Sequence, residues 1–185
     1  DTQRKEYYSV LRAADLWPEI LPEVQISNIS DLEEFIIFSM ANFPIDEQTY
    51  ANLCRRIFKN LTFLDEFDES LKSHGESSGL PKSQRGILRY SKVVTKSLVA
   101  LNNQQLTDPN TPAILADITK SCGYNCTPEG KNNDKLRRNY PSNTGNITIN
   151  CEFHIKINDD NIGTDAAHRE RIYFGILNTE GTRRI

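Results

Sequence analysis

Apolar residues in the first two thirds of the chain recur at helical spacing. In residues 46–61 they fall three and four positions apart, which predicts a helix with one apolar face, and Asp46 directly before them is a suitable N-cap. Four further helices are expected, over residues 6–17, from a Ser30–Glu33 capping box through Met40, from Ser83 to about Asn103, and from Thr111–Pro112 to near Gly123.

The pattern changes after residue 123. Residues 123–145 are rich in Asn, Gly, Pro, Ser and Thr, which indicates a loop. Residues 147–158 then alternate strictly between apolar and polar, which predicts one strand with a buried face, and a second strand is expected over 169–177. Residues 182–185 look like the start of a third strand. Because a two-stranded ribbon is marginally stable alone, it must pack on the helices or pair with a further strand.

These patterns predict an α+β fold, in which an N-terminal helical bundle precedes a small antiparallel sheet. We expect a helical domain over residues 1–122 and a loop plus antiparallel β segment over 123–185, with further chain beyond Ile185. The 185 residues carry 22 basic and 25 acidic side chains and contain no apolar run of about eighteen residues, so no membrane span or membrane partner is expected.

The cysteines and the first residues bear on the compartment. Four cysteines in 185 residues do not form a disulfide framework, and the charged start Asp1–Glu6 does not resemble a signal peptide. We therefore expect a cytoplasmic protein. Four Asn-x-Ser/Thr triplets, at Asn28, Asn60, Asn125 and Asn146, are the contrary sign, since this triplet is the acceptor for glycosylation in secreted proteins.

The polar face of the predicted 147–158 strand presents Glu152, His154 and Lys156 in a row. If the 169–177 strand pairs antiparallel with it, Arg171 and Tyr173 lie on the same face. Metal-independent RNA cleavage by 2′-hydroxyl attack needs a base (His154 or Glu152), cations for the phosphate (Lys156 and Arg171) and an acid (Tyr173 or His154). It needs no cofactor. The alternative is the ordinary polar exterior of an amphipathic sheet with cross-strand ion pairs.

The segment Cys-Glu-Phe-His-Ile-Lys-Ile … Arg-Glu-Arg-Ile-Tyr-Phe-Gly-Ile-Leu, within residues 151–177, resembles the core of RelE/HigB-type bacterial toxin ribonucleases. Those proteins carry a lysine-bearing strand, then a hairpin into an Arg-Ile/Val-Tyr-Phe-like strand. The resemblance implies an endoribonuclease with catalytic roles for Lys156, Arg171 and Tyr173, and His154 as a local addition. Unlike the family, the chain has about 120 mostly helical residues before this segment, and it lacks the family's final strand.

The long helical region suits a protein partner. By analogy with toxin-like or phage-defence effectors, an antitoxin or regulatory protein would bind there. RNA is the other expected partner, because basic residues with the stacking side chain of Tyr140 precede the polar strand. The nucleic-acid-binding candidates are Lys131, Lys135, Arg137, Arg138 and Arg169. The alternative for this basic run is a solvated loop.

Two other interpretations remain open. One is a non-catalytic interaction module, in which the helical scaffold and sheet bind protein or nucleic acid. The other is a zinc-stabilised binding protein, with Cys122, Cys126, Cys151 and His154 as ligands. Because Cys151 and His154 are three apart on one predicted strand, joint ligation requires a break between them.

Overall fold

The structure is a computed structural model that describes residues 28–73, 86–106, 110–129, 134–142, 145–157, 171–179 and 182–185. The chain divides into two compact units, residues 1–39 and 40–185. The predicted helix over 6–17 and the predicted start at Ser83 lie outside the described residues. The candidate site lies wholly in the second unit, which also contains the predicted domain boundary at 122/123.

Within the described residues, five α-helices precede the strands, so the predicted α+β class is confirmed. The helices are α2 (Ile29–Asn42), α3 (Glu47–Ile57), α4 (Glu66–Ser73), α5 (Gly86–Asn102) and α6 (Thr111–Cys122). None of them, over this part of the chain, combines the length and apolar character needed to cross a bilayer. The α4 helix had no sequence-based prediction.

Helix α3 begins where the sequence predicts. The Asp46 side chain accepts a hydrogen bond from the Thr49 backbone N–H at 2.7 Å and another from its hydroxyl at 2.8 Å. The predicted end at Leu61 is wrong, because Phe58 leaves the helical conformation (φ −89°, ψ 75°) while its N–H still bonds to Cys54. Phe58 remains buried at the end of the apolar face.

Asparagine rather than Ser30 or Thr111 caps the two other helices with predicted starts. Asn28 Oδ1 accepts from the Asp31 N–H at 3.0 Å, and Asp31 accepts in return from the Asn28 N–H at 3.2 Å. Asn110 accepts from the Ala113 N–H at 3.4 Å. An asparagine carboxamide caps as well as a hydroxyl, so the apolar pattern alone could not choose between neighbouring candidates.

The core of the second unit includes one buried polar pair. The Tyr50 hydroxyl of α3 lies 2.7 Å from the Thr95 hydroxyl of α5, and both residues are at most 1% exposed. Since a buried hydroxyl without a partner is costly, this hydrogen bond fixes the relative placement of the two helices. Leu98 and Ile118, from α5 and α6, are buried apolar residues of the same unit.

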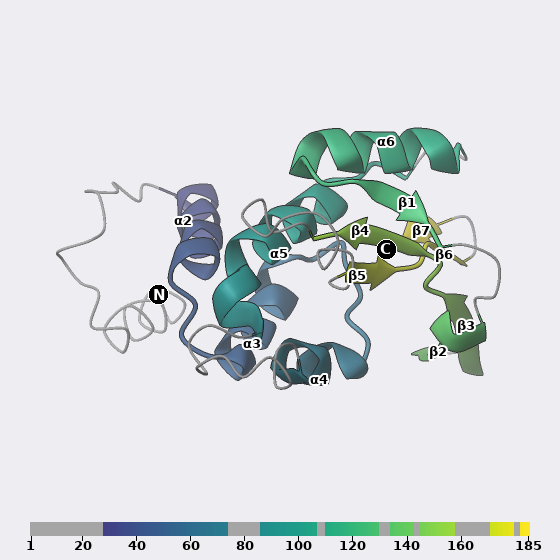
Figure 1. Cartoon of the computed structure of the whole chain (residues 1–185), viewed down its shortest axis with the longest axis horizontal. Coiled ribbons are helices and arrows are strands. Elements are labelled where there is room, and N and C mark those ends of the chain that lie inside the picture. The colour runs from purple at the N-terminus through teal and green to yellow at the C-terminus, as the bar shows by residue number, and fades with distance from the viewer. Residues whose placement is uncertain are drawn as a thin grey trace, which may run out of the picture. The chain divides into compact units, whose positions relative to one another are not determined.

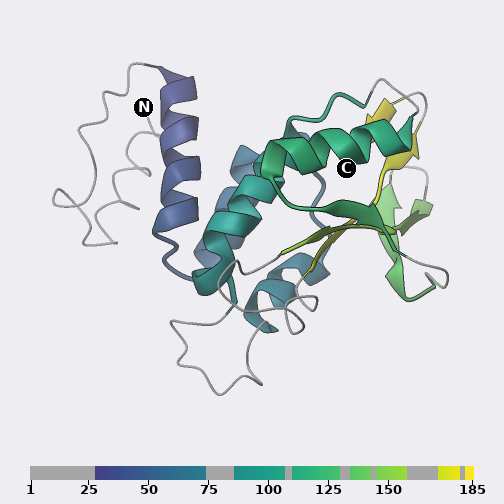
Figure 2. The same cartoon turned by 45° about the horizontal axis from the view of Figure 1, so that its top comes forward.

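The described strands are β1 (Cys126–Pro128), β2 (Arg137–Ser142), β3 (Gly145–Asn150), β4 (Phe153–Lys156), β5 (Arg171–Phe174), β6 (Leu177–Thr179) and β7 (Thr182–Arg184). They form one three-stranded sheet, in the order β1–β4–β5, and two hairpins, β2–β3 and β6–β7, all antiparallel. Helix α6 runs alongside β1 (Figures 1 and 2). The β4–β5 pairing confirms the predicted antiparallel pair, and β1 is the further strand that it needed.

The prediction of a single strand over 147–158 is wrong. The segment breaks at Cys151–Glu152 and belongs to two sheets, because its hydrogen-bonding partner changes there. The Cys151 N–H donates to Leu136 O at 3.0 Å, next to the β2–β3 hairpin, whereas Glu152 O accepts from the Glu129 N–H at the end of β1. The predicted loop over 123–145 is also wrong, since this stretch contains β1, a 3-10 turn (Asp134–Leu136) and β2.

Gly175 marks the place where the two sheets meet. It follows β5, is buried, and lies so close to β3 that a Cβ atom on it would be 2.6 Å from the Asn150 carbonyl oxygen and 2.7 Å from Ile149 Cγ2. Only a residue without a side chain permits this approach.

Candidate functional site

The polar face of the three-stranded sheet collects the side chains of the candidate site. In the register, Thr127 of β1, His154 of β4 and Tyr173 of β5 lie side by side, and Lys156 lies opposite Arg171. Side chains at paired positions of neighbouring strands share a face, so the predicted convergence of these β4 and β5 residues is present. On the other face, Phe153 and Phe174 are buried with ring centroids 5.7 Å apart.

A carboxylate that follows β1 lies at the centre of this group. Glu129 Oε2 accepts a hydrogen bond from Arg171 Nη1 at 2.6 Å and another from the Tyr173 hydroxyl at 3.1 Å. The same oxygen lies 3.4 Å from His154 Nδ1. Arg171 Nη1 also donates to the Tyr173 hydroxyl at 3.3 Å, so three side chains from two strands surround one oxygen atom. We call Glu129, His154, Arg171 and Tyr173 the Glu129 cluster.

His154 is buried, not exposed as the alternation predicts. Its side chain is 3% exposed, and in the register it lies between Thr127 of β1 and Tyr173 of β5. The Nε2 atom lies 3.3 Å from the Thr127 hydroxyl, and the ring centroid lies 5.6 Å from that of Tyr173. The Nδ1 atom has no hydrogen-bond partner in the described part of the chain, since its contact with Glu129 does not have hydrogen-bond geometry.

Burial lowers the pKa of His154 below its usual value, and the positive charges of Arg171 and Lys156 lower it further. The carboxylate of Glu129 opposes this shift but does not reverse it. The imidazole is therefore neutral at pH 7, with one nitrogen free of a proton. A neutral imidazole beside two cations has the protonation state that a general base requires.

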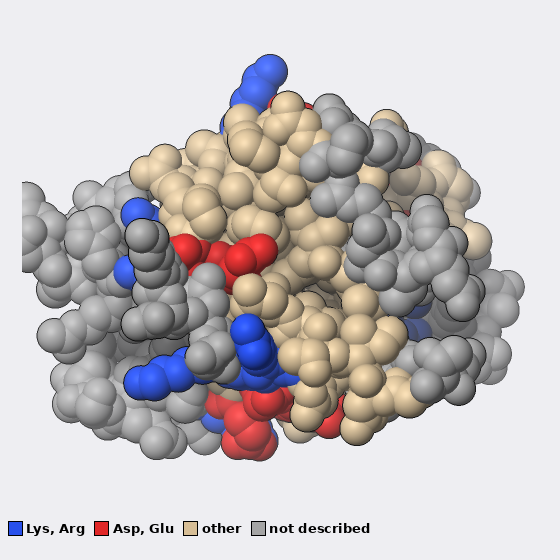
Figure 3. Space-filling view, turned by 90° about the vertical axis from the view of Figure 1, so that its right-hand side faces the viewer, with Lys and Arg blue, Asp and Glu red and all other residues tan. Residues whose placement is uncertain are grey.

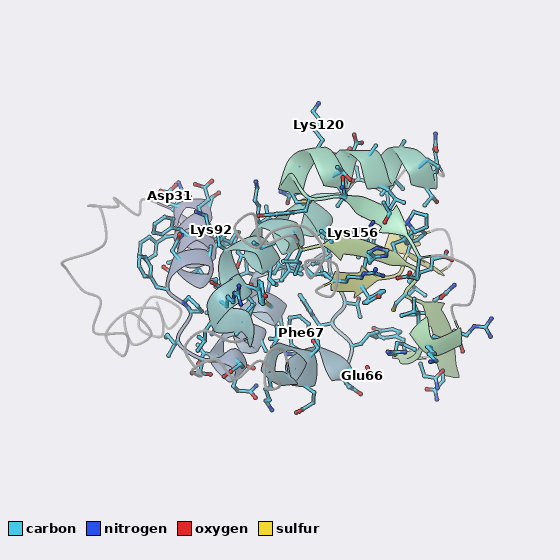
Figure 4. All side chains as sticks on the ribbon, in the orientation of Figure 1. Asp31, Glu66, Phe67, Lys92, Lys120 and Lys156 are labelled. Carbon is cyan, nitrogen blue, oxygen red and sulfur yellow. The ribbon has the colours of Figure 1, made fainter. Side chains whose placement is uncertain are left out.

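Burial raises the pKa of Glu129, but the hydrogen bonds from Arg171 and Tyr173 outweigh this effect, and the net shift is downward. Glu129 is therefore ionised at pH 7 and compensates the charge of Arg171. Unlike Arg171, Lys156 makes no ion pair with any other described residue. It lies on β4 within the sheet (Figure 4). It is the cation of this face that the surrounding described carboxylates do not neutralise.

Glu152 directly precedes β4, and its side chain makes no hydrogen bond or ion pair with the side chains of the Glu129 cluster. Its carboxylate accepts from the Asn150 side chain at 3.1 Å, and its backbone oxygen pairs with Glu129 N–H. Of the five predicted catalytic residues, the structure thus brings His154, Arg171 and Tyr173 into contact and places Lys156 opposite Arg171 in the register.

Of the five predicted nucleic-acid-binding residues, Lys135, Arg137 and Arg138 lie around the start of β2. Lys131 and Arg169 lie outside the described residues, whereas Lys135 and Arg137 are exposed. Arg138 is engaged, since its Nε lies 3.2 Å from Glu66 of α4 and its Nη1 donates to the carbonyl of Lys135. Figure 3 shows basic and acidic side chains next to each other on the side of the molecule that includes β2 and β3, in place of a continuous basic patch among the described residues.

Three cysteines, Cys122, Cys126 and Cys151, were candidate zinc ligands together with His154. These three and Cys54 are buried and free of disulfides. Burial raises the pKa of the Cys54 and Cys126 thiols to about 12 and also raises that of Cys151. No group of three or more His, Cys, Asp or Glu side chains in the described ranges is arranged to hold a metal ion. The interruption of the strand that joint ligation by Cys151 and His154 required is nevertheless present, between β3 and β4.

Glu129 and Thr127 are the members of the site that the sequence reasoning missed. Both belong to the stretch that its composition assigned to a loop. The only sequence signal for a strand there is a short alternation, in which the polar Thr127 and Glu129 alternate with Cys126 and Pro128. A strand of three residues is too short for that pattern to stand out.

Comparison of the chain with models of protein families found no match. Comparisons with curated proteins and with solved structures found none either. The RelE/HigB-type resemblance of residues 151–177 therefore stays an interpretation of the sequence, and the geometry of the Glu129 cluster carries the functional argument.

Proposed function

We propose that the polar face of the three-stranded sheet is the site of a metal-independent endoribonuclease. The observation that carries the proposal is His154, a buried imidazole whose pKa is lowered and whose nearest cations are Arg171 and Lys156. A base, two cations for the phosphate and a phenol as proton donor are the groups that cleavage by 2′-hydroxyl attack requires.

In this proposal His154 takes the proton of the 2′-hydroxyl, and the 2′-oxygen attacks the adjacent phosphorus. The bond from phosphorus to the 5′-oxygen breaks, and the leaving oxygen takes a proton from Tyr173. Lys156 and Arg171 hold the phosphate oxygens, on which negative charge builds. The products are a 2′,3′-cyclic phosphate and a 5′-hydroxyl, and proton exchange with water restores the two side chains.

The test is incubation of unmodified single-stranded RNA with the full chain in EDTA. We expect a 2′,3′-cyclic phosphate product and no cleavage at a 2′-deoxy position. His154→Gln should slow cleavage by about 10²–10⁴-fold, the usual contribution of a general base. Lys156→Ala should slow it too, whereas Lys120→Ala should not, because Lys120 is exposed on α6 and points away from the sheet (Figure 4). Intact RNA at high protein concentration would contradict the proposal.

The same activity would make the protein a cytoplasmic toxin-like or phage-defence effector, controlled by an antitoxin or regulatory protein bound to the helical region. We expect growth arrest on expression in bacteria. The double variant Lys156→Ala/Arg171→Ala should relieve that arrest at equal protein level. Arrest that persists in the double variant would separate toxicity from this site.

A second candidate is a non-catalytic interaction module. The burial of His154 and the pairing of Arg171 with Glu129 favour it, since both side chains are already satisfied or shielded within the protein. This candidate predicts that neither the wild-type protein nor His154→Gln cleaves RNA, and that both bind the partner equally well. Cleavage by the wild-type protein that is lost in His154→Gln would instead support the nuclease.

A further inference from the structure

The oxygen atom at the centre of the Glu129 cluster has the surroundings of a bound oxyanion. Arg171 and Tyr173 donate hydrogen bonds to Glu129 Oε2, and His154 Nδ1 lies 3.4 Å away. A guanidinium and a hydroxyl directed at one oxygen are the donors that proteins use to hold a phosphate. Here a carboxylate of the chain itself occupies that position.

The buried imidazole is a second and independent observation. His154 is 3% exposed, yet its Nδ1 atom has no hydrogen-bond partner among the described residues and faces the same oxygen. Native proteins rarely leave a buried polar atom unpaired, and such an atom calls for an explanation. An oxyanion that sat slightly closer than the carboxylate would satisfy Arg171, Tyr173 and a protonated Nδ1 together.

The charge of the neighbourhood indicates what the occupant is. Glu129 neutralises Arg171, but Lys156, opposite Arg171 in the register, has no ion-pair partner among the described side chains. If the Glu129 side chain rotates away, the Arg171 guanidinium loses this carboxylate and can bind another oxyanion in its place. Glu129 is 29% exposed and is attached to the end of β1, so its side chain can leave without disrupting the sheet.

We propose that Glu129 is an internal occupant of a phosphate-binding site and that a phosphodiester oxygen of single-stranded RNA displaces it. This inference rests on the proposed function, and it adds a regulatory element to that site. In the protein without RNA, the Glu129 carboxylate occupies the hydrogen-bond donors of Arg171 and Tyr173. RNA must compete with a carboxylate that is already in place.

The experiment measures binding without cleavage. The probe is a fluorescent 2′-O-methyl RNA oligonucleotide, which has no free 2′-hydroxyl, and its dissociation constant is measured by fluorescence anisotropy. Glu129→Gln should lower the dissociation constant about tenfold, which corresponds to the free energy of one charge-assisted hydrogen bond. Asp117→Asn is the control for net charge, because this exposed α6 carboxylate pairs with no described residue. It should change the dissociation constant less than twofold.

Tyr173→Phe tests whether the gain comes from the Glu129 cluster. It removes one donor to the oxygen, so in the Glu129→Gln background it should reverse most of the tightening. If Glu129→Gln lowers the melting temperature too far for a folded sample, Glu129→Asp replaces it. The shorter side chain reaches the donors less well and should tighten binding by a smaller factor. Binding by these Glu129 variants no tighter than by Asp117→Asn would overturn the inference.

The two proposals fail in different ways. If the Glu129 variants bind the 2′-O-methyl probe more tightly but no form of the protein cleaves unmodified RNA, the binding site stands and the catalytic proposal falls. If the protein cleaves RNA but the Glu129 variants bind no more tightly, catalysis stands and the role of Glu129 as an internal occupant falls.

Discussion

Replacing Gly175 with alanine should destabilise the junction between the two sheets. The added Cβ would lie 2.6 Å from Asn150 O and 2.7 Å from Ile149 Cγ2. Ordinary contact begins near 3.4 Å, so the shortfall to the backbone oxygen is 0.8 Å (3.4 − 2.6). Because that oxygen belongs to β3, a side-chain rotation cannot relieve the clash, and the backbone must shift.

We expect a cost of about 1–3 kcal/mol, the range for overpacking a buried site. This is a large share of a total stability of roughly 5–15 kcal/mol. With a urea m-value of about 2 kcal/mol/M, the unfolding midpoint should fall by about 0.5–1.5 M. The assay is urea unfolding followed by far-ultraviolet circular dichroism, with the m-value checked for change.

A second substitution identifies the clashing atom. Ile149→Ala removes the Cγ2 contact but leaves Asn150 O in place. The double variant Gly175→Ala/Ile149→Ala should therefore recover little of the stability lost, and the two costs should be close to additive. Full rescue by Ile149→Ala, or a cost of Gly175→Ala below about 0.5 kcal/mol, the spread of neutral surface substitutions, would refute the backbone approach.

Three other outcomes follow from the buried groups. Because the folded-state pKa of His154 is lowered, its contribution to stability is complete above the unfolded value of about 6.5 and declines as the pH falls below it. Urea unfolding at pH 7.5 and 5.5, where Glu129 is mostly ionised in both the folded and the unfolded chain, should show this loss, and His154→Gln should reduce it. Tyr50→Phe should lower the free energy of unfolding by about 1–3 kcal/mol, because it leaves the Thr95 hydroxyl unpaired, and the double variant Tyr50→Phe/Thr95→Val should regain part of that loss. Equal stability of the single and the double variant would count against the hydrogen bond. Burial raises the pKa of Cys126 to about 12, so iodoacetamide at pH 8 should label it only after unfolding, as peptide mass spectrometry would report; rapid labelling of the folded protein would contradict its burial.

The sequence predicted those features that depend on neighbouring residues. Asp46 and the apolar residues after it define the start of α3, because capping and helical periodicity are local. The alternation of His154 and Lys156 with apolar residues, together with that of Arg171 and Tyr173, was enough to place all four on one face of paired strands.

The features that failed depend on which strand lies next to which. Alternation continues through Cys151–Glu152 in the sequence, so nothing local reveals that the hydrogen-bonding partner changes there. The burial of His154 follows from β1 on one side and β5 on the other, and β1 is too short to predict. Glu129 was missed with it. The class of the fold could be predicted, whereas Glu129, at the centre of the candidate site, could not.

The break at Cys151–Glu152 makes the spacing of the chain as important as its chemistry. One additional residue inserted there would leave the β2–β3 hairpin as it is, but it would turn β4 over by one position against β1 and β5. Phe153 and Ile155 would then point toward Glu129, and His154 and Lys156 would point into the apolar interior. The number of residues at 151–152 thus fixes which β4 side chains point to each face of the three-stranded sheet. Deletions or insertions at this point should be far less tolerated than substitutions.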